Sequence, residues 1–266
     1  MARPDTSLDG CTIVMAHPDD ELLWASSLLH RAARILLCFG AVARNPGLSA
    51  GRIALAERYP LPTAAFLAIR ESAVFGRARW PDPPETADGV AIAAAPGLAR
   101  DYRRSYADLV AALPAFLDGA RTVVTHNPWG EYGHEHHVQV LRAVEALQPR
   151  FGYRILVTCY AAQRSLALMG RTLGRLGEPV ADLPTDSRLA ADLSRLYRET
   201  GTWTWFADYR WPATERFFPL RPPGETGPKG AVLSLNMLDY PFAPQPLWAR
   251  ESSRYLAAVR RRLGPG

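Results

Sequence analysis

Two apolar runs with a helical segment between them limit most strongly what this chain can fold into. The first run, residues 12–16, is rich in β-branched side chains, and the second, residues 35–39, is wholly apolar and ends at Gly40. Residues 22–33 lie between them and have the composition of a helix. Short apolar runs on either side of a helix are typical of a βαβ unit with buried parallel strands. The sequence therefore predicts a parallel sheet near the N-terminus.

The same alternation continues through the next hundred residues. Helical patterns are predicted at residues 49–58, 101–117 and 136–147, strands at residues 64–69, 122–125 and 153–160, and a proline-rich loop at residues 80–96. Strands that alternate with helices favour an α/β fold with a mostly parallel sheet covered by helices on both faces.

The last hundred residues have a less regular pattern. Amphipathic spacing predicts a helix over residues 187–199, residues 202–206 alternate with period two, and residues 212–246 are dense in proline and glycine. A basic helix is expected over residues 249–263. We see no linker or internal repeat, and so predict one domain over residues 1–266. Its α/β core spans about 11–160, and the C-terminal extension, about 161–266, is expected to form a wall of the pocket.

Composition narrows the function classes. The 266-residue chain is 48% hydrophobic with a net charge of +5, and its basic residues, almost all arginine, are scattered rather than gathered in a stripe, which argues against nucleic-acid binding. No apolar stretch approaches the roughly 18 residues of a membrane span, and the N-terminus lacks the apolar region of a signal peptide. The three cysteines are widely spaced in apolar runs and are expected to be buried free thiols in a reducing compartment. We expect a cytoplasmic protein without a membrane span.

Two polar clusters follow two of the predicted strands. The first is His17-Pro18-Asp19-Asp20-Glu21, and the second, residues 126–137, contains four histidines. Ligands of open α/β sheets bind beyond the carboxyl ends of the strands, so both clusters are expected at one site. Acids before a helix can also serve only as a cap, but the histidines argue against that role alone.

The residue types are those of a hydrolytic zinc site. Such a site takes three His, Asp or Glu ligands and leaves a position for water, and a further carboxylate acts as general base. His17 and either Asp19 or Asp20 suit these tasks, and the second cluster offers another imidazole. His134 and His137 are three residues apart and share a helical face. His30 and His126 are interpreted as structural or supporting residues.

The two motifs resemble those of a known family. Residues 16–21, AHPDDE, match the first signature of the PIG-L/LmbE-like zinc N-deacetylases, and residues 132–137, YGHEHH, match the second, which usually has Asp before the last histidine. The resemblance covers roughly residues 11–160. It implies a Rossmann-like fold and removal of acetyl groups from N-acetylglucosamine units of glycolipids, thiol-cofactor precursors or antibiotics.

The resemblance also implies roles for individual residues. His17, Asp20 and His137 would bind the metal, Zn²⁺ or another divalent ion such as Fe²⁺. Asp19 would be the general base, His134 would stabilise or protonate the intermediate and leaving amine, and Tyr132 would polarise the carbonyl.

One position departs from the family pattern, because His136 replaces the usual acid. It leaves the role of His134 less defined and makes His136 an alternative ligand. Arg70 after the third strand and Trp129 beside the histidines are candidates for substrate binding. The alternative roles are a surface position for Arg70 and a core position for Trp129, although the glycine-flanked loop beside the histidines favours binding for Trp129.

The expected function is a metal-dependent hydrolase that removes an N-acetyl or other N-acyl group from an amino sugar, in a small molecule or glycoconjugate. One alternative is hydrolysis of a different amide, in a thiol conjugate or an acyl glycopeptide. Another is a non-catalytic metal-binding scaffold, against which the intact Asp19 argues.

Overall fold

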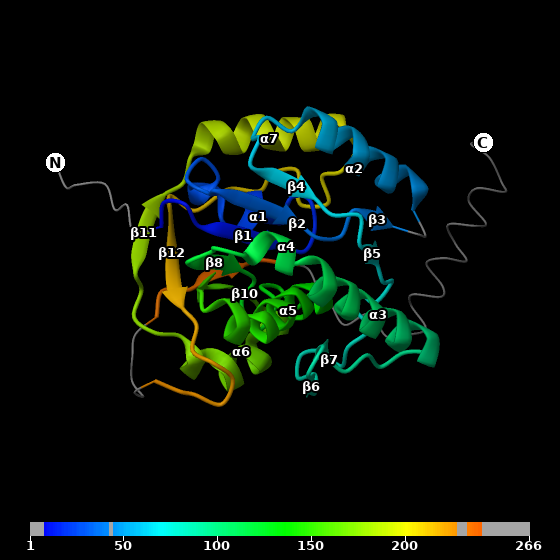
Figure 1. Cartoon of the computed structure of the whole chain (residues 1–266), viewed down its shortest axis with the longest axis vertical. Helices are drawn as coiled ribbons and strands as arrows, with labels where there is room; N and C mark the ends of the chain where they lie inside the picture. The colour runs from blue at the N-terminus through cyan, green and yellow to red at the C-terminus, as the bar shows by residue number, and fades with distance from the viewer. Residues whose placement is uncertain (1–7, 43–44, 228–232, 241–266) are drawn as a thin grey trace.

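The computed structural model describes residues 8–42, 45–227 and 233–240, and its centre is a seven-stranded, mostly parallel sheet (Figure 1). The strands are, in sheet order, β11 (Ala181–Pro184), β12 (Thr214–Pro219), β9 (Arg154–Thr158), β8 (Thr122–Thr125), β1 (Thr12–Met15), β2 (Arg34–Leu37) and β4 (Ala64–Phe66). From β9 to β4 all neighbours pair in parallel, while β12 pairs antiparallel with both β9 and β11. The predicted α/β class and mostly parallel sheet are confirmed.

The order of the strands places the two polar clusters side by side. The chain runs from β1 through β2 to β4 on one side, and then returns to lay β8 on the other side of β1. Thr12 of β1 is paired with Val123 of β8, and Val14 with Thr125. The carboxyl ends of β1 and β8 are therefore adjacent, at the point where the strand order reverses, which is the usual ligand position in this type of fold.

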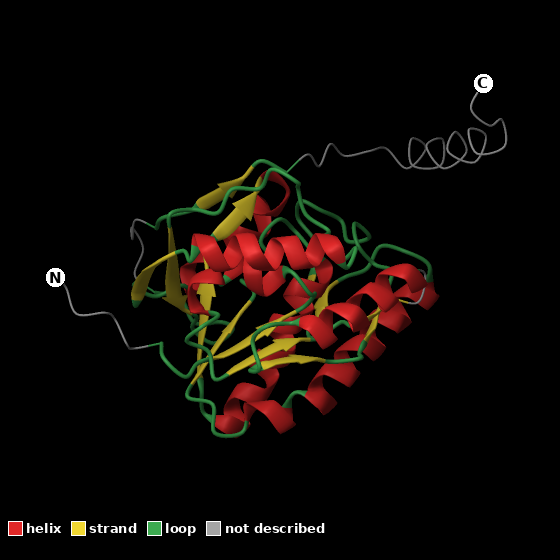
Figure 2. Ribbon diagram, turned by 90° about the horizontal axis from the view of Figure 1, so that it is seen from above, coloured by secondary structure: helices red, strands yellow, loops and turns green. Residues whose placement is uncertain are grey.

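Helices cover both faces of the sheet (Figures 1 and 2). They are α1 (Asp20–Trp24), α2 (Pro46–Arg58), α3 (Pro96–Ala112), α4 (Pro114–Leu117), α5 (Glu135–Phe151), α6 (Leu166–Thr172) and α7 (Ser187–Glu199). In Figure 1, α2 and α7 lie above the sheet, and α3, α5 and α6 lie below it. Within the described residues, none of the helices is both long enough and apolar enough to cross a membrane.

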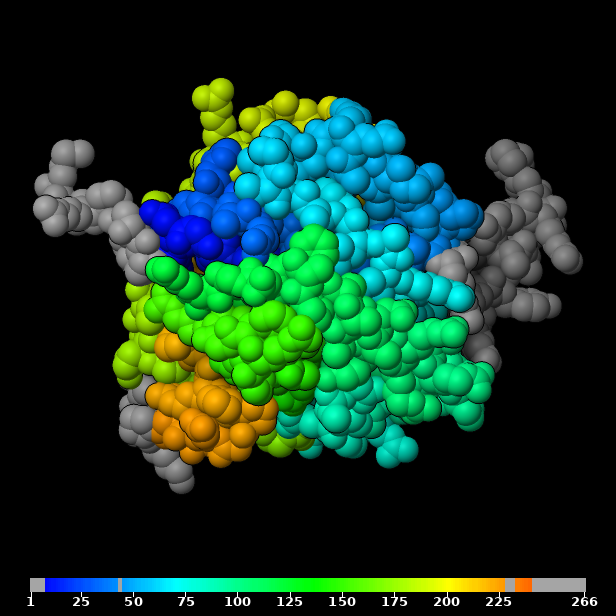
Figure 3. Space-filling view, in the orientation of Figure 1, coloured from blue at the N-terminus to red at the C-terminus, as the bar shows by residue number. Residues whose placement is uncertain are grey.

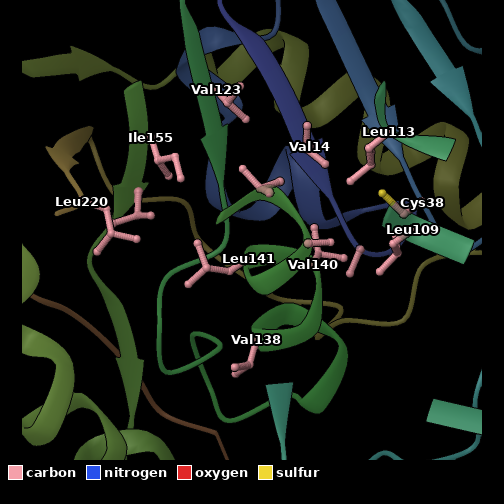
Figure 4. Close-up of a cluster of buried hydrophobic side chains, with 14 of the residues drawn as sticks. Val14, Cys38, Leu109, Leu113, Val123, Val138, Val140, Leu141, Ile155 and Leu220 are labelled. Carbon is pink, nitrogen blue, oxygen red and sulfur yellow. The ribbon is translucent and has the colours of Figure 1, made fainter. Parts of the chain in front are cut away.

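Side chains of successive strand residues enter different cores. Val14 packs into the cluster that contains Val140 and Leu141 of α5, whereas Ile13 and Met15 pack into the cluster on the opposite face. Figure 4 shows the first cluster, where α5 lies against β1 and β8. This packing fixes the start of α5 next to the carboxyl ends of these two strands.

Local sequence explains where the main helices begin and end. The side chain of Asn45 accepts the amide of Leu48 and Pro46 occupies the first turn of α2, while Asp186 caps α7 through the amide of Leu189. Helix α5 ends at Phe151, and the φ of 72° at Gly152, which caps it, suits a glycine.

Small strand pairs complete the described chain. They are β3 (Ala41–Val42) with β5 (Arg70–Glu71), β6 (Glu85–Thr86) with β7 (Gly89–Val90), and β10 (Tyr160–Ala162) with β13 (Asn236–Leu238). The β6–β7 hairpin lies inside the segment predicted as loop.

One predicted helix is wrong in length. The segment 22–33 was expected to be helical throughout, but α1 ends at Trp24 and only a short 3₁₀ turn, Ser26–Leu28, follows. The amides and hydroxyls of Ser26 and Ser27 donate to the buried carboxylate of Glu215 at 2.6–3.1 Å, and a regular α-helix would not present all four donors to one acid.

The C-terminal extension contributes more regular structure than expected. Strands β11 and β12 extend the central sheet, and α7 covers it, as predicted for residues 187–199. The alternating residues 202–206 do not form a strand but an irregular segment whose rings pack inward. In Figure 3 the orange residues of this extension lie beside the green segment of α5. The predicted basic helix over residues 249–263 lies outside the described residues.

Candidate metal centre and active site

The candidate site is built from the loops that follow β1 and β8. The first loop carries His17 and Asp19 into α1, and the second carries Tyr132 and His134 into α5. The side chains of both loops are almost completely buried, including the ionisable ones. Buried charges need partners, so their contacts define what the site can bind.

Asp20 lies at the centre of the cluster. Its Oδ2 accepts the backbone amide of His17 at 2.7 Å and lies 3.1 Å from Nδ1 of His17 and 3.3 Å from Nε2 of His137. Its Oδ1 accepts the indole N–H of Trp24 at 2.9 Å. The sequence left open whether Asp19 or Asp20 faces the histidines, and the structure brings Asp20 between them.

Asp20 lies at ligand spacing from both His17 and His137. Bonds of about 2.0–2.1 Å to a tetrahedral zinc ion place neighbouring donors roughly 3.3 Å apart. The contacts of Asp20 with His17 and His137 are 3.1 and 3.3 Å. In addition, Nε2 of His137 is buried and has no hydrogen-bond partner among the described residues. An orphaned imidazole nitrogen beside a carboxylate fits a metal ligand.

Asp20 and His137 interact electrostatically, and each shifts the pKa of the other. Burial alone would raise the pKa of Asp20, but His137 and His17 hold it well below its usual range. Burial alone would lower the pKa of His137, but Asp20 and Glu131 raise it to about 10. The two shifts describe one tightly coupled pair, in which the carboxylate is ionised and the imidazole is protonated.

Glu131 supports His137 from behind. Its Oε2 accepts Nδ1–H of His137 at 2.6 Å and Nδ1–H of His126 at 3.0 Å, and its Oε1 accepts the amide of Asn127. Metal-binding histidines commonly donate their second N–H to a carboxylate, which orients the ring. Glu131 therefore fixes the direction in which Nε2 of His137 points, a role that its loop position in the sequence did not reveal.

His126 is next to the centre but turned away from ligation. Its Nε2 lies 3.6 Å from Asp20 Oδ2 but accepts the backbone amide of Ala16 at 2.9 Å, and its Nδ1 donates to Glu131. Both ring nitrogens are thereby used, so the group Asp20–His126–His137, although compact, offers only two free donors.

Asp19 faces the cluster from the other side and is held by the C-terminal extension. Its Oδ2 accepts both the amide (3.1 Å) and the hydroxyl (2.7 Å) of Thr204, and its own amide donates to Glu21. Its backbone has a φ of 110°, a left-handed conformation that costs free energy in a non-glycine residue. Burial, followed by the neighbouring Asp20, raises the pKa of Asp19 well above its usual value.

The other histidines of α5 have different surroundings. Nδ1 of His134 accepts the amide of His136 at 3.1 Å, which caps α5, and its ring stacks between Phe75 and His137. Nδ1 of His136 instead lies 3.3 Å from Nε2 of His17. Burial, followed by neighbouring imidazoles, lowers the pKa values of His134 and His136 well below the usual range.

A cavity of about 180 Å³ opens onto the cluster. It is lined by His17, Asp19, Asp20, Leu23, Leu48, Arg52, Glu71, Phe75, Tyr132, His134, Thr204, Trp205 and Tyr240. The C-terminal extension thus walls the pocket, as expected from the sequence. Arg52, Phe75 and Thr204 were not anticipated, because the spacing of these residues along the chain carries no motif.

The two predicted substrate residues lie elsewhere. Arg70 lines a separate cavity beside α3, and Trp129 is fully buried and donates its indole N–H to the carbonyl of Tyr160. Neither side chain lines the pocket over the cluster, and Trp129 belongs to the hydrophobic core that α5 packs into. His30 is exposed and distant, near Asp186.

Comparisons with known proteins support the fold. No protein-family model matches the chain, and no curated protein matches its sequence. Among solved structures, the zinc-inhibited form of teicoplanin deacetylase aligns with a TM-score of 0.50 at 12% identity, covering 81% of this chain and 99% of the other. A deacetylase–bog complex from the biosynthesis pathway of teicoplanin aligns with the same TM-score and coverage at 13% identity. At this identity the likeness is one of fold.

Proposed function

We propose that this protein is a metal-dependent hydrolase that removes an N-acyl group, most simply acetyl, from an amino sugar in a small molecule or glycoconjugate. The observation that carries the proposal is that Asp19, His17 and Asp20 line one pocket, with His137 3.3 Å behind Asp20. The two sequence motifs and the deacetylase fold of the aligned structures support the same reaction.

The residues present fit a divalent ion. His17 Nδ1, Asp20 Oδ2 and His137 Nε2 would hold it, and their mixed nitrogen and oxygen donors suit zinc and also ferrous iron. When bound, the ion supplies Lewis acidity that polarises the amide carbonyl and makes water a stronger acid.

Asp19 is the general base of the proposed reaction. Thr204 occupies Oδ2 of its carboxylate, so Oδ1 is the oxygen that remains to take a proton from the attacking water. The raised pKa makes Asp19 a stronger base than an exposed carboxylate, and also a competent acid once it is protonated. We therefore assign Asp19 both proton transfers, first from the water and then to the leaving amine.

His134 donates a hydrogen bond rather than a proton. Because its Nδ1 accepts the amide of His136, the neutral ring carries its hydrogen on Nε2. Its lowered pKa keeps the ring neutral near pH 7. Nε2–H of His134 is then suited to stabilise the developing oxyanion, and Tyr132, which also lines the pocket, is a second donor.

The test is release of free amine from a panel of N-acyl amino sugars by the zinc-loaded and iron-loaded protein. The panel includes N-acetylglucosamine, its glycosides and long-chain N-acyl analogues, because Phe75, Trp205 and Tyr240 give the pocket apolar walls. Asp19→Asn should keep the metal and lose about 10²–10⁴-fold in turnover. Asp20→Asn should lose metal as well.

Substitution of His30, which is exposed and outside the site, is the matched control for His134→Ala. His134→Ala should reduce turnover with the metal content unchanged, and His30→Ala should change neither. Release of amine only from thiol conjugates or acyl glycopeptides would show that the substrate is one of these and not an amino sugar. Metal binding without hydrolysis of any amide would favour a non-catalytic scaffold.

A further inference from the structure

The side chain of His136 occupies a defined place in the centre, although its position in the second motif usually holds an acid. It is fully buried, with Nδ1 at 3.3 Å from Nε2 of His17 and Nε2 at 2.7 Å from the hydroxyl of Ser72. The ring centroid of Phe39 lies 4.5 Å from that of the imidazole and the stacked ring of Tyr102 lies at 6.1 Å, so two aromatic rings restrict the orientation of His136.

We propose that Ser72 and His136 form a hydrogen-bonded chain that positions His17 as a metal ligand. The inference rests on the proposed metal centre and names the residues that support it on the side opposite Glu131. His136 is thus a positioning residue, and it acts on the metal only through His17.

The direction of each hydrogen bond follows from the ligand atom. Nδ1 of His17 faces Asp20, so this nitrogen gives its lone pair to a metal, and the hydrogen of the neutral ring must then be on Nε2. Nε2–H of His17 donates to Nδ1 of His136, whose own Nε2–H donates to the hydroxyl oxygen of Ser72. Both ring nitrogens of His136 thereby have a partner, as burial requires.

In the metal-free protein the same hydrogen bonds can form with donors and acceptors exchanged. Nδ1–H of His17 then donates to Asp20, Nε2 of His17 accepts from His136, and Ser72 donates to His136. A carboxylate at position 136 could only accept, whereas imidazole and hydroxyl groups can exchange roles. The pair therefore holds His17 in the same place in both states without adding a buried charge.

A second cation bound between His17, His136 and Glu71 would use the same atoms. Glu71 Oε1 lies 4.0 Å from Nε2 of His17, and the three residues form a compact group. However, the guanidinium of Arg52 is buried and bonds Glu71 at 2.8 Å, so a positive charge already faces this carboxylate. This charge favours positioning over a second cation.

Zinc affinity of the metal-stripped protein, measured by competition with a chromophoric chelator, tests the chain. Ser72→Ala and His136→Leu should each weaken zinc binding about 10–100-fold. His136→Asn should retain part of the affinity, because its amide can still meet His17 but cannot reach Ser72. Ser105→Ala is the matched control, since Ser105 is also a buried serine but bonds only the carbonyls of Arg70 and Asp101.

Nitrogen-15 NMR of the histidine rings is a second measurement that does not depend on stability. In the zinc-loaded protein, His17 and His136 should both carry hydrogen on Nε2, and in Ser72→Ala the Nε2 resonance of His136 should move.

Three results would overturn the inference. These are wild-type affinity in both Ser72→Ala and His136→Leu, a loss in Ser105→Ala as large as that in Ser72→Ala, or a stoichiometry of two zinc ions that Glu71→Gln reduces to one. If the wild type binds no zinc, both the proposed metal centre and the hydrogen-bonded chain that supports it are rejected. Weakened binding in the variants, with no amine released by the wild type, would support the chain and reject the deacetylase.

Discussion

Glu131→Gln is the most informative single change to the centre, because this carboxylate supports two histidines at once. Burial alone would raise the pKa of Glu131, but its contacts with His126 and His137 lower it to about 2 from an ordinary 4.5. A shift of 2.5 units at 1.36 kcal/mol per unit corresponds to about 3 kcal/mol of stability. The metal-free variant should therefore unfold with a free energy roughly 3 kcal/mol lower than the wild type at pH 7.

The pH dependence distinguishes this electrostatic effect from simple loss of packing. The folded-state pKa is below the unfolded one, so the stabilisation is complete above about pH 5.5 and is lost as the pH falls toward the folded pKa of about 2. Between pH 7 and pH 4 the difference between wild type and variant should shrink by about 1 kcal/mol.

Urea unfolding at several pH values measures these differences. The control is Glu199→Gln, an exposed acid paired with Arg58, which should change stability by less than about 1 kcal/mol at any pH. Glu131→Gln should also weaken zinc binding by about 10–100-fold, because His137 loses the acceptor that orients it. A stability difference that does not change with pH, or unchanged zinc affinity, would refute the role assigned to Glu131.

Three further changes test other contacts. Thr204→Val should lower turnover about 10–100-fold with the metal content unchanged, because a hydrogen bond to a charged group contributes about 1.5–3 kcal/mol, and Thr204→Ser should restore the rate. In the Asp19→Asn background Thr204→Val should cost nothing more, and an additive loss would show that Thr204 acts by another route. Glu135→Gln should destabilise the protein by about 3 kcal/mol, because this buried carboxylate accepts the amides of residues 76–78, and faster hydrogen exchange confined to that loop would confirm it. The three buried thiols, whose pKa values burial raises, should react with a disulfide reagent at pH 8 only after urea is added, and rapid labelling of the native protein would contradict their burial.

The parallel part of the sheet could be predicted because its strands are short apolar runs separated by helices. The antiparallel strands β11 and β12 could not. Strand β12 lies in a proline-rich segment and pairs with β9, and β11 pairs only with β12, so both are defined by their partners rather than by their own pattern. The helix expected over residues 22–33 is interrupted by Glu215, an acid nearly two hundred residues away. Contacts at such separation override local propensity and leave no trace in spacing.

The site was likewise predictable only in part. The two motifs identify the loops, and the adjacency of β1 and β8 brings these loops together. The residues that contact these loops from elsewhere could not be predicted, because Thr204, for example, bonds Asp19 from a position 185 residues away. Arg70 and Trp129 were expected at the pocket but do not line it, because nearness to a loop in the sequence does not determine the direction of a side chain.

The backbone of Asp19 and Glu131 has a consequence for engineering this protein. They are the non-glycine residues of the described chain with positive φ, 110° and 51°, and each such conformation costs about 1–3 kcal/mol. Glycine at position 19 would relieve that cost, so a selection for heat tolerance alone would favour it, although it deletes the proposed base. Glycine at position 131 would relieve the strain but would also lose the roughly 3 kcal/mol that the Glu131 carboxylate contributes. Thermostable variants that retain function must therefore keep Asp19 and gain their stability elsewhere, and position 19 marks where a stability screen would select against activity.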